Sequence, residues 1–406
     1  MSNHGAVANH LRVDLVVDDG PRHAGTKLVE AVISLRPLID VLPPPIAIVS
    51  QNGNKGPAPV PDLGLLNRIA SRLGVPPFAF CPHANELAMF GRIVTSRLAW
   101  AEHLPSVGRL SADSTFDLDS IVDEVVNRSF ELYCDRAETM SVGGVPINVY
   151  AAGDPNRKAV VIASVCGMPA KLSEPWIRFL ARDYFVVTWE TRGLFGKSRL
   201  FEDLDCSVEA QTADAFAAMD HFRVPRAHFM GMCGGALIAL TAAAQSHARV
   251  SSLSIWHGDL DLGATCPKTT HQRDLQAVIS MATEQHVSPR DLHRVLCQSM
   301  TANVPEDLDP LVLYPYASPE LLFAYCKLNG NIMRTNAAQY LPLIAQPALV
   351  VTSEDDETAH PAGSKHVAAV LPHATLRVES HGNHISLFRG MANLRQIAAD
   401  FIAAVE

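Results

Sequence analysis

Short apolar runs alternate with longer amphipathic stretches through the last two-thirds of the chain. Residues 173–183 and 208–222 have apolar side chains at helical spacing. Runs with the length of buried strands lie at residues 159–165, 184–190, 226–230, 252–256, 347–352 and 374–378. Strands and helices that alternate in this way form a mostly parallel sheet with helices on both faces. The pattern predicts an α/β domain over residues 130–406 that opens with a hairpin at 138–152.

One segment, at about residues 262–343, interrupts this alternation. Helical spacing recurs in it over residues 272–285, 289–300 and 318–328. Its large apolar side chains include Tyr314, Tyr316, Phe323, Tyr325 and Met333. We expect a helical insert whose apolar side chains either line a pocket or pack the insert against the sheet.

The first 125 residues precede this domain and carry a different pattern. Short strands are predicted at residues 11–17, 46–50 and 78–80, and helices at 27–41, 62–73 and 85–103. A further helix at 113–128 would join this part to the rest of the chain. Residues 1–125 are therefore expected to form a small α/β or mostly helical appendage. It carries no motif, and a role in homodimerisation, in docking of a partner or in the substrate channel is open.

Composition narrows the class of protein. With 406 residues, of which 48% are hydrophobic and 18% charged, the chain can bury one large core or two modest ones. A net charge of -9 without a basic stripe argues against a nucleic-acid partner. The chain has no apolar leader and no run long enough to span a membrane, so we expect a cytoplasmic protein without a membrane partner. Its eight cysteines form no CxxC pair, so most are expected to be reduced and structural.

The most informative motif is Gly231-Met232-Cys233-Gly234-Gly235, between the apolar run at 226–230 and a helix-forming stretch at 236–240. A strand that reverses sharply into a helix holds the central residue in a strained conformation, and flanking glycines avoid collisions there. The thiol is then presented above the edge of the sheet. It also lies at a helix N-terminus, which favours the thiolate. The motif predicts a nucleophile elbow with sulfur as the nucleophile.

Two loops after the Cys233 motif contain further candidate catalytic residues, first acidic side chains and then histidines. The strand at 347–352 leads into Ser353-Glu354-Asp355-Asp356, and the strand at 374–378 leads into Glu379-Ser380-His381-Gly382-Asn383-His384. Nucleophile, acid and histidine, each on a loop after a strand, resemble the catalytic triad of the α/β-hydrolase superfamily. The resemblance covers roughly residues 130–406. It implies the α/β-hydrolase fold, with the insert at 262–343 as a cap over the active site.

Two further motifs are similar to this superfamily. Cys166-Gly167-Met168-Pro169 resembles its HG-x-P oxyanion loop, with Cys in place of His. Glu190 and the residues that follow resemble its D-x-R-G-x-G-x-S turn, with Glu for Asp and one extra residue. Because the third and fifth strands are neighbours in the superfamily, Cys166 and Cys233 could approach one another and form a disulfide. The alternative is that Cys166 is only a small buried side chain.

The resemblance assigns a role to each candidate residue. Cys233 is the nucleophile, His384 the base and Asp356 the acid that orients the histidine. The backbone N–H groups of Gly234 and Met168 form the oxyanion hole. Residues left as alternatives are Asp355, Asp259 and Asp261 for the acid and His381 for the histidine.

A cysteine nucleophile favours acyl-thioester chemistry. The covalent intermediate would itself be a thioester, close in energy to an acyl group on CoA or a carrier protein, so the acyl group stays activated for transfer. We therefore expect an acyltransferase or thioesterase that acts on a CoA- or carrier-bound acyl group. Cys at this position also resembles polyhydroxyalkanoate synthases and dienelactone hydrolases.

Three alternatives to this activity remain open: an ester or lactone hydrolase, a carbon–carbon bond hydrolase, and a non-catalytic binding protein with this fold. No cofactor is expected. A metal is not expected either, because the histidines are dispersed and form no HExxH motif.

Overall fold

The computed structural model describes residues 20–49, 63–81, 87–102, 117–195, 203–264, 266–284, 288–299 and 304–405. The predicted strand at 11–17, the loop at 51–61 and the end of the turn that follows Phe195 lie outside these ranges. No helix in the described part of the chain is long and apolar enough to span a membrane.

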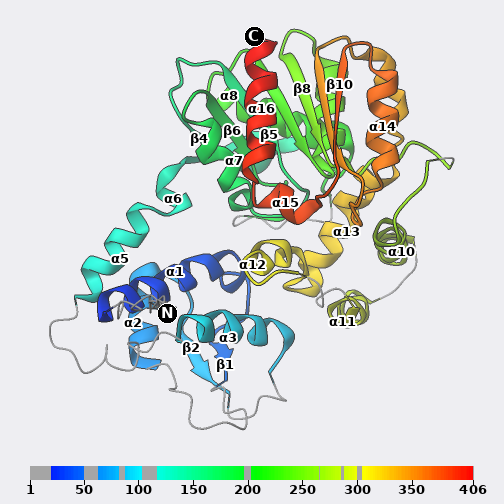
Figure 1. The fold of residues 1–406 in the computed structure, drawn as a ribbon. Coiled ribbons are helices and arrows are strands. Elements are labelled where there is room, and N and C mark those ends of the chain that lie inside the picture. Colours follow the sequence, from blue (N-terminus) through cyan, green and yellow to red (C-terminus); the bar gives the residue numbers. More distant parts are fainter. Residues whose placement is uncertain are drawn as a thin grey trace, which may run out of the picture.

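An eight-stranded sheet forms the centre of the larger domain (Figure 1). Its strands are β3 (Asp135–Ser141), β4 (Val145–Ala152), β5 (Ala159–Ala163), β6 (Phe185–Trp189), β7 (Ala227–Met232), β8 (Val250–Trp256), β9 (Ala348–Ser353) and β10 (Ala374–Glu379). Their order is β10-β9-β8-β7-β5-β6-β4-β3, parallel from β10 to β6, with β4 antiparallel to both β6 and β3. The predicted mostly parallel sheet and its opening hairpin are thus both present.

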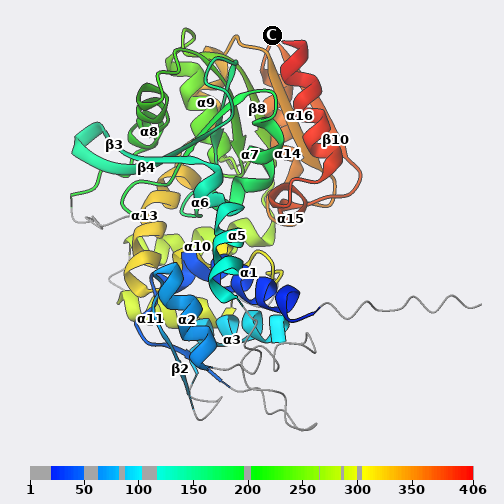
Figure 2. The same ribbon diagram turned by 90° about the vertical axis from the view of Figure 1, so that its left-hand side faces the viewer.

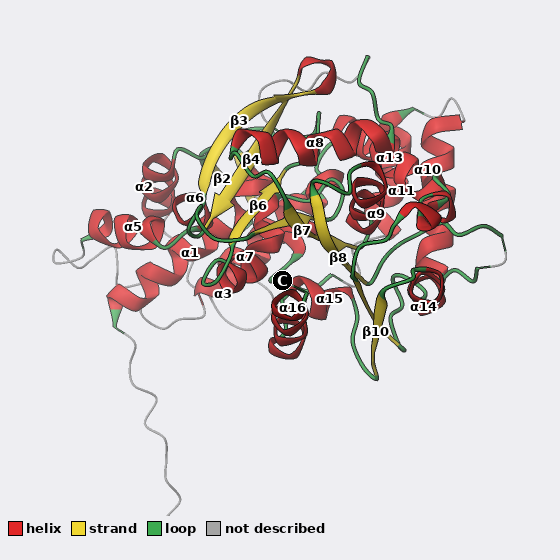
Figure 3. Ribbon diagram, turned by 90° about the horizontal axis from the view of Figure 1, so that it is seen from above, coloured by secondary structure: helices red, strands yellow, loops and turns green. Residues whose placement is uncertain are grey.

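Helices cover both faces of this sheet because successive side chains of each buried strand point to opposite sides. Val161, Phe229 and Ile255 belong to one apolar cluster, and Val160, Met230 and Trp256 to the other. The first face is covered by α8 (Val208–His221), α9 (Gly235–Gln245) and α14 (Pro361–Val370), and the second by α7 (Glu174–Leu180) and α16 (Ala392–Ala404). Figure 3 shows α8 and α9 on one side of the strands and α7 and α16 on the other.

The predicted helical insert is present between β8 and β9. It contains α10 (Thr270–Glu284), α11 (Pro289–Ser299), α12 (Asp309–Val312), α13 (Pro319–Arg334) and the short 3-10 turns η4 (Tyr314–Tyr316), η5 (Ala337–Gln339) and η6 (Leu341–Leu343). In Figure 1 these helices lie at the end of the sheet that faces the N-terminal part of the chain. That position makes the insert a cap over the carboxyl ends of the parallel strands.

The N-terminal part is mostly helical, with a small parallel pair of strands. It contains α1 (Pro21–Ile39), β1 (Ile46–Ile48), α2 (Leu63–Leu73), β2 (Phe78–Phe80), α3 (Met89–Glu102) and α5 (Leu118–Asn127), and α6 (Phe130–Tyr133) leads into the sheet. Helix α5 begins at Leu118, where the Asp117 side chain caps it by accepting a hydrogen bond from the Ser120 N–H. The first residues of the predicted helix, 113–116, lie outside the described ranges.

This appendage packs on the cap (Figure 2). Helix α1 contacts α12, and the rings of Phe90 and His293 stack with centroids 6.5 Å apart. Lys171, just after the predicted oxyanion loop, donates to the carbonyl of Ile33 in α1 at 3.2 Å. The appendage is therefore in direct contact with both segments that border the predicted site.

Candidate active site

Cys233 occupies a strained turn between β7 and α9. Its φ of 51° lies in the left-handed region, which non-glycine residues rarely adopt. Its N–H donates to the carbonyl of Trp256 at 3.0 Å, and its own carbonyl accepts from the Asp259 N–H at 3.3 Å. The end of β8 and the residues after it therefore fix the backbone of Cys233 from both sides.

Two of the three glycines of this turn, Gly231 and Gly235, are required by space. A Cβ at Gly231 would lie 2.7 Å from the Ala236 Cα, and one at Gly235 would overlap the carbonyl of Ala163 in β5. A Cβ at Gly234 would meet only the side chains of Ile332 and Asn329, at 3.4 and 3.6 Å. The close approach of α9 to β5 explains the motif, as expected for a nucleophile elbow.

His384 and Asp356 lie together next to Cys233. His384 is the first residue of α15 (His384–Phe388), and its Nδ1 lies 3.1 and 3.2 Å from the two carboxylate oxygens of Asp356. Its Nε2 has no nitrogen or oxygen partner among the described residues, and it lines the same cavity as Cys233. The structure thus brings together the three residues that the sequence proposed as a triad: Asp356 contacts His384, and His384 lines one cavity with Cys233.

A second histidine, which sequence analysis missed, shares the carboxylate. The Nδ1 of His257 lies 2.8 Å from the Asp356 Oδ2, and both side chains are fully buried. Two backbone N–H groups, of Thr358 and Ala359, also donate to the Asp356 Oδ1. His257 directly follows β8 at the edge of the sheet where the other site residues lie, and that position was the available clue.

The neighbouring carboxylate and histidine form a separate pair in solvent. Asp355 accepts from the His381 Nδ1 at 3.1 Å and from the Gly382 N–H at 2.8 Å, and the His381 side chain is 89% exposed. Of the two adjacent acids, Asp356 alone faces His384. The alternatives Asp355 and His381 therefore pair with each other rather than with the triad.

The other alternative acids also have their own partners. Asp261 forms an ion pair with Lys268 at 3.0 Å. Asp259 accepts from the Gln272 Nε2 at 2.6 Å and lines the cavity without a hydrogen bond to His384.

The charges in the site favour the protonated form of His384. Burial opposes protonation of His384, but the negative charges of Cys233 and Asp356 outweigh it and hold the pKa of His384 well above its usual range. Burial likewise raises the pKa of Asp356, but the charge of His384 and the hydrogen bonds from His257 and His384 lower it far more. Asp356 is therefore a firmly ionised partner for the imidazolium.

The two backbone N–H groups predicted to form an oxyanion hole differ in their hydrogen bonds. Gly234 directly follows the nucleophile, and its N–H makes no backbone hydrogen bond within the described residues. The Met168 N–H donates to the carbonyl of Val165 at 3.2 Å, although Met168 does line the cavity. Val165 lies in the same loop and lines the cavity too, which makes its N–H a second candidate for the donor.

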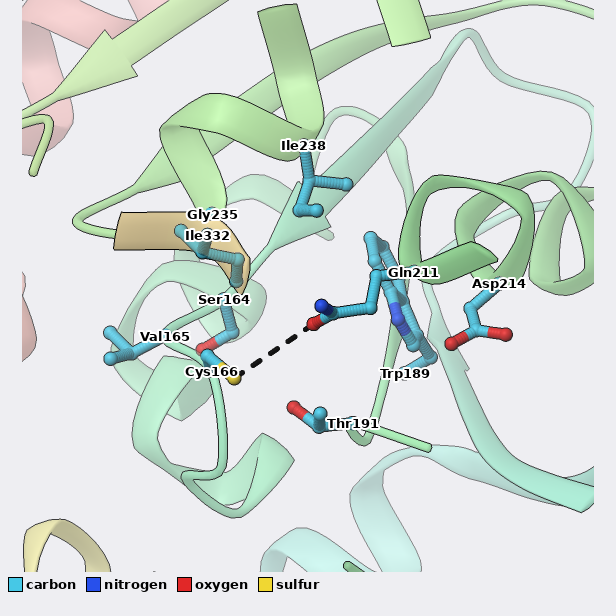
Figure 4. A pocket seen from close by; sticks show the side chains of 10 residues that line it. All are labelled: Ser164, Val165, Cys166, Trp189, Thr191, Gln211, Asp214, Gly235, Ile238 and Ile332. Carbon is cyan, nitrogen blue, oxygen red and sulfur yellow. Dashed lines mark hydrogen bonds between the residues drawn. The ribbon is translucent and has the colours of Figure 1, made fainter. Parts of the chain in front are cut away.

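Cys166 does not line the cavity that contains Cys233 and His384. Its thiol is buried, lies 3.9 Å from the Gln211 Oε1 and lines a separate small cavity (Figure 4). Burial raises the pKa of Cys166, so the thiol stays protonated. The arrangement fits the alternative in which Cys166 is a small structural side chain.

A cavity of about 490 Å³ opens in front of Cys233. Met168, Cys233 and His384 line its floor, and the apolar residues around them come mainly from the cap and from α15: Leu275, Val278, Leu296, Val304, Leu308, Val312, Leu313, Tyr316, Tyr325, Ile385 and Phe388. Its polar groups are Asp259, His271, Asp274, Asn329 and Thr358. No described residue of the N-terminal appendage lines it, so the appendage supports the cap from outside.

Three groups of the site have a spacing that a metal ion could use. The ligand atoms of His257, Asp356 and His384 lie within 4.8 Å of one another. Both histidines direct Nδ1 to the carboxylate at hydrogen-bond distance, however. The two histidines are therefore arranged as hydrogen-bond donors to the ionised carboxylate of Asp356.

Fold and site together define an α/β-hydrolase-fold protein. The solved structure of the enol-lactonase from Burkholderia xenovorans LB400 is similar over 66% of this chain and 100% of its own, with a TM-score of 0.52 and 19% identity. The 2-hydroxy-6-oxo-6-phenylhexa-2,4-dienoate hydrolase from Rhodococcus sp. strain RHA1 is similar over 66% and 99%, with a TM-score of 0.53 and 19% identity.

Sequence relatives agree with this class. A putative carbamate hydrolase, RutD, from Pseudomonas syringae pv. syringae (strain B728a) is 23% identical over 58% of this chain and 90% of its own. The 3-oxoadipate enol-lactonase 2 from Acinetobacter baylyi is 22% identical over 61% of this chain and 90% of its own. No family model matches the chain.

Proposed function

We propose that this protein cleaves an activated acyl compound through a covalent thioester on Cys233. The preferred substrate is an acyl thioester of CoA or of a carrier protein. The observation that carries the proposal is the buried contact of His384 with Asp356 beside a cysteine held in the left-handed region. A serine in the same place would form an ester intermediate. A cysteine forms a thioester, which keeps the acyl group ready for transfer.

The reaction divides into two balanced steps. The Cys233 thiolate attacks the acyl carbonyl, the donor carbon–sulfur bond breaks, and His384 gives its proton to the departing thiolate, which leaves as a thiol. An acceptor then attacks the Cys233 thioester, His384 takes the acceptor's proton, and the Cys233 thiolate leaves. Asp356 stabilises the imidazolium whenever it forms, and the Gly234 N–H donates to the oxyanion.

A second candidate is hydrolysis of an ester or lactone, with water as the acceptor. The names of the relatives favour it, since two of them are enol-lactonases and one is a putative carbamate hydrolase. The two candidates share the covalent step and differ in the donor that loads Cys233.

Intact-protein mass spectrometry tests both. The protein is incubated with short, medium and aromatic acyl thioesters, and in parallel with lactones and aryl esters. A mass gain equal to the acyl group, present in the wild type and absent in Cys233→Ala, is the expected result for thioesters. Labelling by esters or lactones alone would favour the second candidate, and no labelling or turnover with any donor would overturn the covalent mechanism.

A further inference from the structure

We propose that Asp259 marks an acceptor subsite beside Cys233 that binds a primary amine, so that the acyl group is passed to nitrogen. The inference rests on the proposed function, because it names the compound that removes the acyl group. It starts from a carboxyl group that the triad does not use. Asp259 lies in the cavity with Cys233 and His384, and its backbone N–H is bonded to the carbonyl of the nucleophile.

The carboxylate of Asp259 is held in a fixed orientation. Gln272, which is 4% exposed, donates from Nε2 to the Asp259 Oδ1 at 2.6 Å. The Gln272 Oε1 accepts from the N–H groups of Thr269 and His360 at 2.9 and 3.1 Å, so the amide cannot turn over without losing both bonds. A side chain locked in this way is preorganised for a ligand.

The charges of His384 and Lys268 lower the pKa of this carboxylate, but neither side chain forms a hydrogen bond with it. Lys268 is bonded to Asp261 and Gln276 instead, and no Lys or Arg forms an ion pair with Asp259 within the described residues. Burial raises the pKa of Asp259, which shows that its charge is poorly solvated. A partly desolvated carboxylate gains most from a ligand that brings a positive charge or N–H donors.

The charges around the cavity select the same kind of ligand. Asp259 and Asp274 are its two carboxylates outside the triad, and no Lys or Arg is among the described residues that line it. Burial and the charge of His384 lower the pKa of His271, so that side chain is neutral. The carboxylates of Asp259 and Asp274 therefore repel an anionic acceptor and attract an ammonium group.

The transfer step balances without another reactant. The amine enters as an ammonium ion and loses one proton to solvent. Its nitrogen attacks the Cys233 thioester while Asp259 accepts a hydrogen bond from the remaining N–H, and His384 takes the second proton. The carbon–sulfur bond to Cys233 breaks, an amide is released, and the thiolate–imidazolium pair is restored.

Two measurements test the subsite, and the first needs no acyl donor. n-Butylammonium and n-butanol are compared, at pH 7.5, for their ability to slow alkylation of Cys233 by iodoacetamide, followed on the peptide that contains Cys233. The wild type is expected to need at least tenfold less butylammonium than butanol for half protection. In Asp259→Asn the two compounds should differ by less than threefold, while Asp261→Asn, whose carboxylate pairs with Lys268, should behave as the wild type.

The second measurement follows the acylated protein after addition of n-butylamine, n-butanol or 4-aminobutyrate. Amide is expected to form at least tenfold faster from n-butylamine than from 4-aminobutyrate, and faster than the butyl ester forms. In Asp259→Asn this preference should be lost when each rate is expressed relative to the amount of acylated Cys233 at the start. A melting temperature within a few degrees of the wild type shows that the variant is folded.

The outcomes separate the two proposals. Protection by butylammonium that depends on Asp259, together with no acylation by any donor, would leave the amine subsite standing and overturn the proposed function. Acylation without any difference between butylammonium and butanol in the wild type would overturn the subsite and keep the function. If Asp259→Asn does not fold, the comparison of the three acceptors on the wild type decides alone.

Discussion

His257 and His384 both direct Nδ1 to the carboxylate of Asp356, at 2.8 and 3.1 Å, and their rings are 5.7 Å apart. The acid of the candidate triad is therefore clamped between two imidazoles. His257 also fixes the end of β8, since its N–H donates to the carbonyl of Val351 at 2.9 Å. The same short segment holds the backbone of Cys233, so nucleophile and acid are positioned by one strand end.

This relationship predicts a positioning role for His257 that a pH profile can detect. His257→Leu removes this hydrogen bond, so the pKa of Asp356 should rise toward its usual value. At low pH Asp356 then loses its negative charge more readily and no longer stabilises the protonated ring of His384. A hydrogen bond to a charged group contributes about 1.5–3 kcal/mol, which corresponds to about 1–2 pH units. The acid limb of Cys233 alkylation by iodoacetamide should therefore move upward by about one pH unit.

Two variants make that result specific. His257→Asn keeps an N–H donor and should recover at least half of the shift. His228→Asn removes an equally buried histidine elsewhere in the sheet, and its profile should match the wild type even if its melting temperature falls. An unchanged acid limb in His257→Leu would show that His257 is only a packing residue.

The structure contains two Asp–His pairs, Asp356 with His384 and Asp355 with His381, and the exposed second pair is a matched control for the buried first pair. Asp356→Asn and His384→Ala should each slow Cys233 alkylation at pH 7 at least 100-fold, because the thiolate loses its charged partner. Asp355→Asn and His381→Ala change an exposed pair and should alter the rate less than twofold. Similar losses in both sets would reject Asp356 and His384 as the functional pair.

The central sheet could be predicted from the sequence because inner strands such as β5, β6 and β9 are mostly apolar runs buried on both faces. The elbow could be predicted as well, since the glycines at 231 and 235 have a steric reason that does not depend on the rest of the fold. The ends of the strands were predicted less accurately. The strand predicted at 159–165, for example, ends at Ala163, where the loop turns toward the cavity.

The partners of polar side chains could not be predicted in the same way. Asp355 and Asp356 are adjacent, and only the path of the chain after β9 turns one to solvent and the other to His384. His257 carries no motif, and its role arises because β8 and β9 are neighbours in the sheet. The Met168 N–H belongs to a matching motif, yet a local turn engages it with Val165.

The steric difference among the elbow glycines predicts unequal effects of one added methyl group. Gly231→Ala and Gly235→Ala place a Cβ against backbone atoms that cannot move, so each should lower the free energy of unfolding by several kcal/mol or abolish soluble expression. Gly234→Ala keeps its N–H and meets only two side chains, so a loss below about 1 kcal/mol is expected. Urea unfolding monitored by circular dichroism measures the three values. Equal losses at Gly234 and Gly235 would contradict the proposed close approach of α9 to β5.

His228 predicts a loss of stability in mild acid that is independent of the active site. It is buried in β7 between the hydroxyls of Ser252 and Ser254, at 2.8 and 2.9 Å, and burial lowers its pKa from 6.5 to about 3. Below pH 6.5 the unfolded chain binds a proton at this residue that the folded chain does not bind. The contribution of neutral His228 to the free energy of unfolding is therefore complete above pH 6.5. It is lost as the pH falls toward 3, by up to about 1.4 kcal/mol per pH unit.

The measurement is urea unfolding of the wild type and His228→Gln at several pH values between 7.5 and 4.5. At pH 7.5 the variant should be less stable, because it loses ring packing and at least one hydrogen bond. As the pH falls the wild type should lose stability faster, so the two curves converge by at least 1 kcal/mol at pH 5, where the unfolded chain carries most of the extra proton. His366→Gln, at an exposed position, should run parallel to the wild type. Parallel curves for His228→Gln would mean that this histidine is protonated in the folded protein, with its charge held between the two serines.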